Sequence, residues 1–389
     1  MVETMRKSVI IYISLIFFIL SVCSCNNNHN LLVSRGVVGL DRYANITDGQ
    51  SLNSTVVTIS NNVPNISSIA STPVIANTTE SSNPLNPFGL MLGNTIKSPG
   101  DEIEVAKNMG ARYYRFGVTL TEVPDNITAT KILNNGLNAV ITIRYNGNQK
   151  GPSSPPPDIS VFKNSISKVI DRDHPSVLVY ENEEDSPNFN FYTGNNTQYL
   201  EGLKAVCEVA HQKGVKCANG GITSASSVLV TADYYENENP NSEKFNIVTN
   251  NTLHPYFEKI FQDGGNTTTN PYFADRIISA KELISKYKEN GADYMNFHWH
   301  AQSSAALALV IEVLRNQSGL PVITNEFAPE TMNTPDGLFQ LLNTFYELQV
   351  PIAIEYALGS NVLTNSDGTL LSDGQVYQQF MNQHFSASK

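Results

Sequence analysis

The sequence is poor in cations, in cysteine and in tryptophan. Its 389 residues contain 25 Lys and Arg against 36 Asp and Glu, so the net charge is −11, and no basic cluster stands out. A negative surface repels phosphate backbones, and nucleic acid is therefore not an expected partner. No apolar run reaches the roughly 18 residues of a transmembrane helix. The four cysteines are too few for a disulfide-rich scaffold.

The first residues have the pattern of an export signal. Arg6 and Lys7 precede an apolar run over residues 9–22, and Val-Cys-Ser-Cys follows at 22–25. This stretch resembles a bacterial lipobox, in which the cysteine after a small residue is acylated, and Cys25 fits because serine precedes it. We expect a lipoprotein at the cell surface or membrane. A plain cleaved signal with secretion, or an uncleaved anchor, remains open.

Three parts of the chain are expected. Residues 1–25 form the signal peptide, and residues 26–85 form a low-complexity linker rich in Asn, Ser and Thr. Such a composition cannot bury enough apolar surface to offset chain entropy, so we expect a disordered spacer. Residues 86–389 form the single large domain. Its length suits one barrel domain of about 250 residues with additions.

The large domain contains two cysteines, Cys207 and Cys217. An even number in an oxidising compartment makes a disulfide possible. Cys207 lies in a helical pattern, however, and Cys217 begins a predicted strand. Two buried thiols are therefore the favoured interpretation, with the disulfide as the alternative.

From Pro87 onward, short apolar runs rich in β-branched and aromatic residues alternate with stretches of helical period. This alternation is typical of successive βα units. Eight such units close most economically into a parallel (β/α)8 TIM barrel. A doubly wound open sheet is the alternative, but no glycine-rich phosphate loop follows the first run. The predicted strands are Phe88–Leu92, Ala111–Val118, Ala139–Tyr145, Val177–Tyr180, Val215–Gly220, Tyr294–His298, Pro321–Thr324 and Ile352–Tyr356.

The stretches between these strands predict helices, several of which end at a glycine that suits a C-cap. A polar insertion over residues 223–275 follows the fifth strand. Because loops after barrel strands build the functional face, we expect this insertion to be a long loop that forms one wall of a cleft. The predicted helices are Asp101–Met109, Val161–Ile170, Thr197–Gln212, Ile277–Asn290, Ser304–Asn316 and Pro335–Gln349.

Acidic residues follow two of the predicted strands. The fourth strand ends in Glu-Asn-Glu-Glu-Asp at 181–185, and the seventh ends in Thr-Asn-Glu-Phe at 324–327. The carboxyl ends of parallel barrel strands meet at one rim, so we expect Glu183 and Glu326 to face each other. Cleavage of a glycosidic bond needs two facing carboxylates: one protonates the leaving oxygen, and the other attacks the sugar or activates water.

With Asn182-Glu183 at the end of the fourth strand and Glu326 at the end of the seventh, residues 87–385 resemble the clan A superfamily of (β/α)8 retaining glycoside hydrolases. The resemblance implies that Glu183 is the general acid/base and Glu326 the nucleophile. It also implies that Asn182 binds the sugar 2-hydroxyl and that Arg115 supports the nucleophile. A purely structural role for Arg115, and a strand-end salt bridge for Glu326, remain open.

The chain departs from this superfamily at two strand ends. His298-Trp299-His300 stands where the family usually has His-X-Tyr, and Tyr356 stands where it usually has a tryptophan under the sugar. Tyr356 could supply the stacking surface instead. The expected substrate-binding residues are Arg115, Asn182, His298, Trp299, His300, Glu355 and Tyr356.

Together these patterns predict an exported glycosidase that cleaves β-glycosidic bonds of an oligo- or polysaccharide with retention. We expect carboxylate groups about 5 to 5.5 Å apart. We expect a monomer that uses no cofactor and no metal, binds carbohydrate as its substrate, and touches the membrane through its lipid anchor only.

Other functions remain open on the sequence alone. The acidic run 181–185 could be a solvated surface or bind calcium. His298 and His300 could bind a metal with Glu326, although no third histidine lies nearby in the sequence. An inactive barrel that acts as a surface carbohydrate-binding lipoprotein is the main alternative. A barrel enzyme of different chemistry, such as a metal-dependent lyase or deacetylase, is the other.

Overall fold

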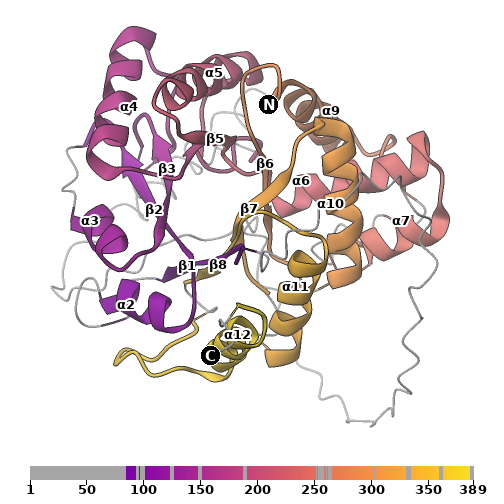
Figure 1. The fold of residues 1–389 in the computed structure, drawn as a ribbon. Coiled ribbons are helices and arrows are strands. Elements are labelled where there is room, and N and C mark those ends of the chain that lie inside the picture. The colour runs from indigo at the N-terminus through magenta and orange to yellow at the C-terminus, as the bar shows by residue number, and fades with distance from the viewer. Residues whose placement is uncertain are drawn as a thin grey trace, which may run out of the picture. The chain divides into compact units, whose positions relative to one another are not determined.

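The computed structural model describes residues 85–385, apart from 93–95, 97–100, 123–126, 148–150, 187–190, 251, 253–257, 260, 262–264, 302, 330–333 and 359–361. The expected signal peptide, Cys25 and the expected spacer up to residue 84 therefore lie outside the described residues. Within the described residues, parallel strands form a ring, and the helices lie around it (Figure 1).

The sheet contains the eight strands that the sequence predicts. Its order is β5-β4-β3-β2-β1-β8-β7-β6, and every laddered pair of neighbours is parallel. Sequential strands thus neighbour one another, and β1 pairs with β8, which is the topology of a (β/α)8 barrel. The prediction of a barrel is confirmed. The strands are β1 (Phe88–Leu92), β2 (Tyr113–Thr119), β3 (Asn138–Arg144), β4 (Val177–Tyr180), β5 (Lys216–Asn219), β6 (Met295–Trp299), β7 (Val322–Phe327) and β8 (Ala353–Ala357).

The ring closes between β5 and β6 without a regular ladder in the described residues. The backbone N–H of Asp293 donates to the carbonyl of Cys217 at 2.9 Å, beside an isolated bridge between Ala218 and Tyr294. A second isolated bridge joins Ile222 to Phe297. Between the two bridges, the side chain of Asn219 accepts from the N–H of Asn296 (2.6 Å) and donates to that residue's carbonyl (2.8 Å). We call this β5–β6 contact the seam.

The helices follow the strands as predicted, with one clear error. All six predicted helices are present, and the largest difference is at α9, which runs over Pro271–Lys286 instead of Ile277–Asn290. The segment 223–275, predicted as a loop, begins instead with helices. The helices are α2 (Asp101–Asn108), α3 (Ile127–Asn134), α4 (Ile159–Asp173), α5 (Asn196–Gln212), α6 (Ser224–Asp233), the π-helix η2 (Tyr234–Glu238), α7 (Ser242–Thr249), α9 (Pro271–Lys286), α10 (Ser304–Ser318), α11 (Pro335–Glu347) and α12 (Ser372–Phe385).

Local sequence accounts for many of the helix ends. Asp158 and Ser303 accept backbone N–H groups in the first turns of α4 and α10, and Asn195 forms a capping box with Gln198 at the start of α5. Gly319 ends α10 in the left-handed conformation that favours glycine. Helix α6 begins in the same way, because the hydroxyl of Thr223 accepts the N–H of Ser226.

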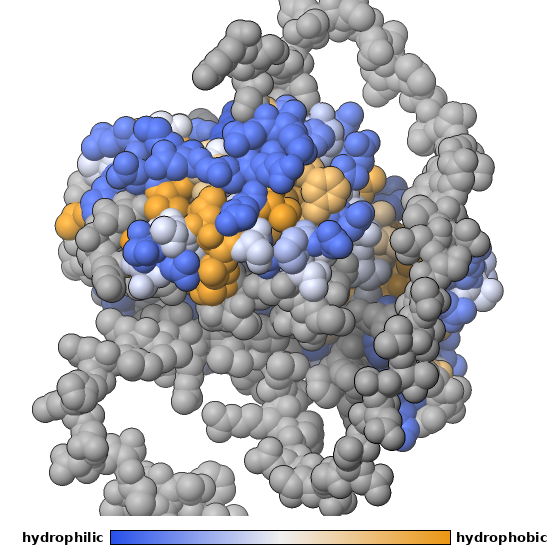
Figure 2. Space-filling view, turned by 90° about the horizontal axis from the view of Figure 1, so that it is seen from below, coloured by the Kyte–Doolittle hydropathy of each residue, from blue (hydrophilic) through white to orange (hydrophobic). Residues whose placement is uncertain are grey.

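The core has two layers. Inside the ring, strand residues of alternating register pack on one another: Tyr113, Val140, Val177, Val179, Ala218, Ile323, Ile352 and Ile354. A larger cluster fills the space between the strands and the surrounding helices. Seen from below, the described surface is mostly hydrophilic with smaller apolar areas (Figure 2). Among the described helices, none combines the length and apolar character that a bilayer crossing requires.

Cys207 of α5 and Cys217 of β5 form a disulfide, with Cα atoms 5.4 Å apart. The prediction of two free buried thiols was wrong. Periodicity correctly put each cysteine on the buried side of its element, since both are almost completely inaccessible. It could not reveal that this helix position lies directly over this strand position.

Candidate active site

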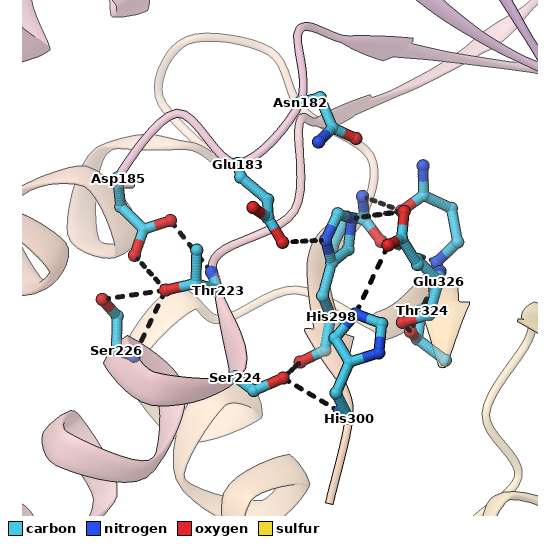
Figure 3. A network of polar contacts seen from close by, with 12 residues as sticks. Asn182, Glu183, Asp185, Thr223, Ser224, Ser226, His298, His300, Thr324 and Glu326 are labelled. Carbon is cyan, nitrogen blue, oxygen red and sulfur yellow. Dashed lines mark hydrogen bonds and ion pairs between the residues drawn. The ribbon is translucent and has the colours of Figure 1, made fainter. Parts of the chain in front are cut away.

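The two predicted acids converge at the rim formed by the carboxyl ends of the strands. Glu183 lies in the loop after β4, and Glu326 lies near the end of β7. One oxygen of each carboxylate lies within 4.8 Å of the other. Their side chains approach His298 from opposite sides (Figure 3). Both side chains are largely buried, with only about a tenth of each exposed.

The loop that carries Glu183 has an unusual backbone. Glu181 and Glu183 adopt left-handed conformations, with φ of 64° and 46°, which are costly for residues other than glycine. The side chain of Glu181 anchors this loop, because it accepts the N–H of Tyr145 (3.0 Å) and the hydroxyl of Ser153 (2.8 Å). Burial raises the pKa of Glu181 to about 7, although these donors and Arg144 act in the opposite direction.

Glu184 anchors the other side of the same loop. Its Oε1 accepts from Nδ2 of Asn219 (3.0 Å) and from the hydroxyl of Tyr287 (2.7 Å). Burial, assisted by the charge of Asp185, raises the pKa of Glu184 to about 7. Asp185 turns elsewhere and accepts the N–H and hydroxyl of Thr223. The side chains of the acidic run 181–185 therefore diverge to separate hydrogen-bond partners instead of facing one point.

A β-bulge in β7 brings Glu326 into the site. Asn296 pairs with Ile323 and His298 pairs with Glu326, so β7 advances by three residues while β6 advances by two. Such an extra residue re-aims the side chains that follow it. As a result, Asn325 and Glu326 both contact His298, although strict alternation would send neighbouring side chains to opposite faces.

Cationic and histidine neighbours keep Glu326 ionised. Nη1 of Arg115 donates to Oε2 at 2.5 Å, Nε2 of His300 lies 3.3 Å from Oε1, and Nε2 of His298 lies 4.0 Å from Oε2. Burial alone would raise the pKa of Glu326, but His298, Arg115 and His300 outweigh it and hold that pKa well below its usual range. Glu326 is thus a carboxylate at neutral pH.

A ladder of asparagines determines which nitrogen of His298 donates. The N–H of Asn325 donates to Oδ1 of Asn296 (2.9 Å), so the NH2 group of Asn296 faces Oδ1 of Asn325 (2.8 Å) and the carbonyl of Asn219 (3.1 Å). Oδ1 of Asn325 also lies 3.0 Å from Nε2 of His298, which must be the donor. The other ring nitrogen, Nδ1, lies 3.0 Å from Oε1 of Glu183. These two groups therefore share one proton.

Two further predicted residues face the site. Nη2 of Arg115 donates to Oδ1 of Asn182 at 2.9 Å, so one guanidinium links Asn182 to Glu326. The ring of Tyr356 is half-buried, with its centroid 6.3 Å from that of His300. Burial and the charge of Glu326 raise the pKa of Tyr356 to about 12, so its hydroxyl stays protonated.

Two predicted site residues point elsewhere. Trp299 is fully buried and packs near Phe297 in the layer between strands and helices, so it offers no surface to a sugar. Glu355 is also buried, and its ionisable neighbours are Asp373 and Tyr377 of α12. Period-two alternation explains both cases, because His298 and Ile354 face the barrel interior and their successors face outward.

Three residues that hold the site together were missed from the sequence. Ser224, at the start of α6, accepts the N–H of His300 (2.9 Å) and donates to the carbonyl of His298 (3.1 Å), as Figure 3 shows. Asn325 orients the His298 ring. Gly221, at φ 104°, lets that ring approach, since a Cβ there would lie 2.3 Å from Nε2 of His298. The only sequence signal for Ser224 was its place just after a predicted strand.

The chain is similar to several solved glycoside hydrolase structures. It is similar to an oligosaccharide-binding protein of glycoside hydrolase family 128 from Trichoderma gamsii (14% identity, TM-score 0.43, covering 78% of this chain and 97% of that one). It is also similar to an endo-β-1,4-glucanase from Xanthomonas axonopodis pv. citri (10% identity, TM-score 0.48, covering 78% of this chain and 100% of that one). A third similar structure is an endo-1,4-β-D-mannanase from Thermotoga petrophila (13% identity, TM-score 0.46, covering 76% of this chain and 99% of that one). No family model and no curated protein matches the chain. At these identities the likeness concerns the fold alone.

Proposed function

We propose that this protein is an exported glycoside hydrolase that cleaves β-glycosidic bonds of an oligo- or polysaccharide with retention. The supporting observation is that oxygens of Glu183 and Glu326 lie within 4.8 Å of each other in contrasting surroundings. Carboxyl groups of retaining enzymes are about 5 to 5.5 Å apart, whereas inverting enzymes separate them by about 6.5 to 9.5 Å to admit a water. This short separation supports the retaining arrangement.

The contrasting surroundings assign the two roles. Glu326, held ionised by Arg115, attacks the anomeric carbon. Glu183 shares a proton with His298 and delivers it to the departing oxygen. In the second half-reaction, Glu183 takes a proton from water, which then displaces Glu326 and restores the anomeric configuration.

Two neighbours would hold the sugar during these steps. The side-chain amide of Asn182, oriented by Arg115, has donors available for the hydroxyl next to the anomeric carbon. The ring of Tyr356 offers a flat surface beside Glu326. These contacts would fix the anomeric carbon between the two carboxylates.

The test is turnover of a panel of aryl β-glycosides and glycans by the wild type, Glu183→Gln and Glu326→Gln. Both variants keep side-chain volume, and exposed Glu282→Gln is the matched control. We expect Glu326→Gln to fall to background and Glu183→Gln to lose about 10²- to 10⁴-fold. The product formed first, followed by NMR, should be the β-anomer. Equal turnover in all four proteins, or an α-anomer, would rule out this mechanism.

The same panel separates hydrolysis from the alternative function. A surface carbohydrate-binding protein would bind glycans in calorimetry and turn none of them over. In that case Glu326→Gln would weaken binding without any change in rate. Turnover by the wild type would exclude this alternative.

The proposal includes a lipid anchor at Cys25, which supports location at the cell surface. The test is fractionation of bacterial cells that express the wild type or Cys25→Ala. The wild type should fractionate with membranes and take up labelled fatty acid, and Cys25→Ala should do neither. Label on Cys25→Ala would move the site of acylation to Cys23.

A further inference from the structure

The candidate active site also presents the donor set of a metal site. One ligand atom each from Glu183, His298, His300 and Glu326 lies within 4.8 Å of the other three. Two imidazoles and two carboxylates are the ligands that Zn²⁺ prefers, in tetrahedral geometry with bonds of about 2.0 to 2.2 Å. Such bonds put neighbouring donor atoms about 3.3 Å apart. Two donor pairs already have about that spacing, with 3.0 Å between His298 and Glu183 and 3.3 Å between His300 and Glu326, and the other pairs lie within 4.8 Å.

The surroundings hold these donors in the orientation that a metal requires. Nε2 of His298 donates to Asn325, which leaves Nδ1 as the ligand atom beside Glu183. Arg115 donates to Oε2 of Glu326, while Oε1 of the same carboxylate faces His300. A bound cation would displace the proton that Glu183 and His298 share, and the two carboxylates would then offset its charge beside one guanidinium.

We infer that these four side chains bind one divalent transition-metal ion, best matched by Zn²⁺, and that the bound ion excludes turnover. Binding depends on the geometry alone. Only the loss of turnover rests on the proposed function, because coordination occupies both Glu183 and Glu326. The sequence left open a metal at His298, His300 and Glu326, but it gave no sign that Glu183 would be the fourth ligand.

The binding test is calorimetric titration of zinc chloride into the full-length protein. We expect one ion per chain. His300→Phe, which keeps a ring but removes the ligand nitrogen, should bind roughly tenfold or more weakly, and Glu183→Gln should lose affinity as well. Magnesium chloride should give no binding heat, because Mg²⁺ demands octahedral oxygen ligands.

His211→Phe is the matched control. His211 lies in the other cluster of metal-ligating residue types among the described residues, with Asp293 and Cys217, but Cys217 is held in the disulfide. This variant should bind zinc as the wild type does. Absence of zinc binding in the wild type, or equal affinity in His300→Phe, would overturn the inference; a loss seen only in His211→Phe would move the site.

Turnover of an aryl glycoside is the second readout. Zinc should inhibit the wild type, a chelator should restore the rate, and the residual rate of His300→Phe should be insensitive to zinc. Activation by zinc would overturn the claim that metal and turnover exclude each other. If the protein turns over no glycoside at all, the proposed function fails while the titration still decides the metal site. A rise in melting temperature with zinc confirms that the binding form is folded.

Discussion

The ring of His298 lies between the two carboxylates and contacts both. Its Nδ1 shares a proton with Glu183, while its Nε2 belongs to the asparagine ladder that begins at Asn219. Because its described contact is with the acid Glu183, we treat this histidine as a positioning residue. Its effect should depend on how much the leaving group needs a proton.

His298→Gln provides the test of that role. For a phenyl glycoside, whose leaving group needs protonation, kcat/KM should fall about 10- to 100-fold, part of the full effect of general acid catalysis. For a dinitrophenyl glycoside, which departs without a proton, kcat/KM should change little. An equal loss on both substrates would indicate a structural role only. His211→Gln is the control.

Glu355 is a buried carboxyl group that contacts neither Glu183 nor Glu326 in the described hydrogen bonds and ion pairs. Burial and the nearby Asp373 raise its pKa well above the usual value of 4.5, and no described residue bonds its Oε2. A group with a raised folded-state pKa contributes stability that is fully present below the unfolded pKa. That contribution is lost as pH rises toward the folded pKa, by about 1.4 kcal/mol per unit.

Glu355→Gln should therefore stabilise the protein at high pH and have little effect at low pH. The glutamine cannot lose a proton, so its melting temperature should exceed that of the wild type at pH 8 and approach it at pH 4. Thermal unfolding followed by circular dichroism at both pH values measures this difference. The exposed Glu347→Gln is the control. An equal difference in melting temperature between Glu355→Gln and the wild type at both pH values would show that ionisation of Glu355 is not the cause.

Among the elements, the strands could be predicted well and their irregularities could not. All eight strands follow from apolar runs bounded by glycine and polar residues. Alternation also accounts for Trp299 and Glu355, which were predicted in the site. Once His298 and Ile354 face the barrel interior, the residues that follow them face outward. The bulge that turns Glu326 inward leaves no signal in the sequence, since it depends on pairing with β6.

The error over residues 223–275 has a different cause. The sequence there is rich in polar residues, and polar composition predicts a loop. Yet Thr223 is an N-cap, and the apolar run Val228–Val230 is fully buried in α6. Capping and burial outweigh composition here. The helix start then supplies Ser224, which holds β6 in place.

The disulfide between α5 and β5 should stabilise the folded chain through its restriction of the unfolded one. The two cysteines are separated by 10 residues. For a loop of that size, chain entropy predicts a loss of about 3 kcal/mol in the free energy of unfolding when both become alanine. Urea unfolding of Cys207→Ala/Cys217→Ala measures it. The wild type should lose similar stability under a dithiol reductant, and an unchanged midpoint would show that the bond is absent in solution.

For the whole molecule, the barrel domain should fold without residues 1–84. The first described contacts come from Asn86, which caps the N–H of Phe88 and donates to the carbonyl of Gly110, both at 2.8 Å. A chain that starts at Leu85 should match the full-length protein in melting temperature and kcat/KM. A chain that starts at Phe88 loses both bonds and should be less stable by about 1 to 3 kcal/mol. Unfolding of the chain that starts at Leu85 would show that the preceding residues belong to the domain.

The seam between β5 and β6 is the place where we expect the ring to open locally. The other neighbouring strands are joined by parallel backbone ladders. At the seam, isolated bridges, a few backbone hydrogen bonds and the side chain of Asn219 join β5 to β6. Deuterium should therefore enter the amides of Asp293 and Asn296 sooner than those of β2 and β3. Because Asn219 also begins the ladder that orients His298, each such opening would interrupt proton delivery as well as the fold.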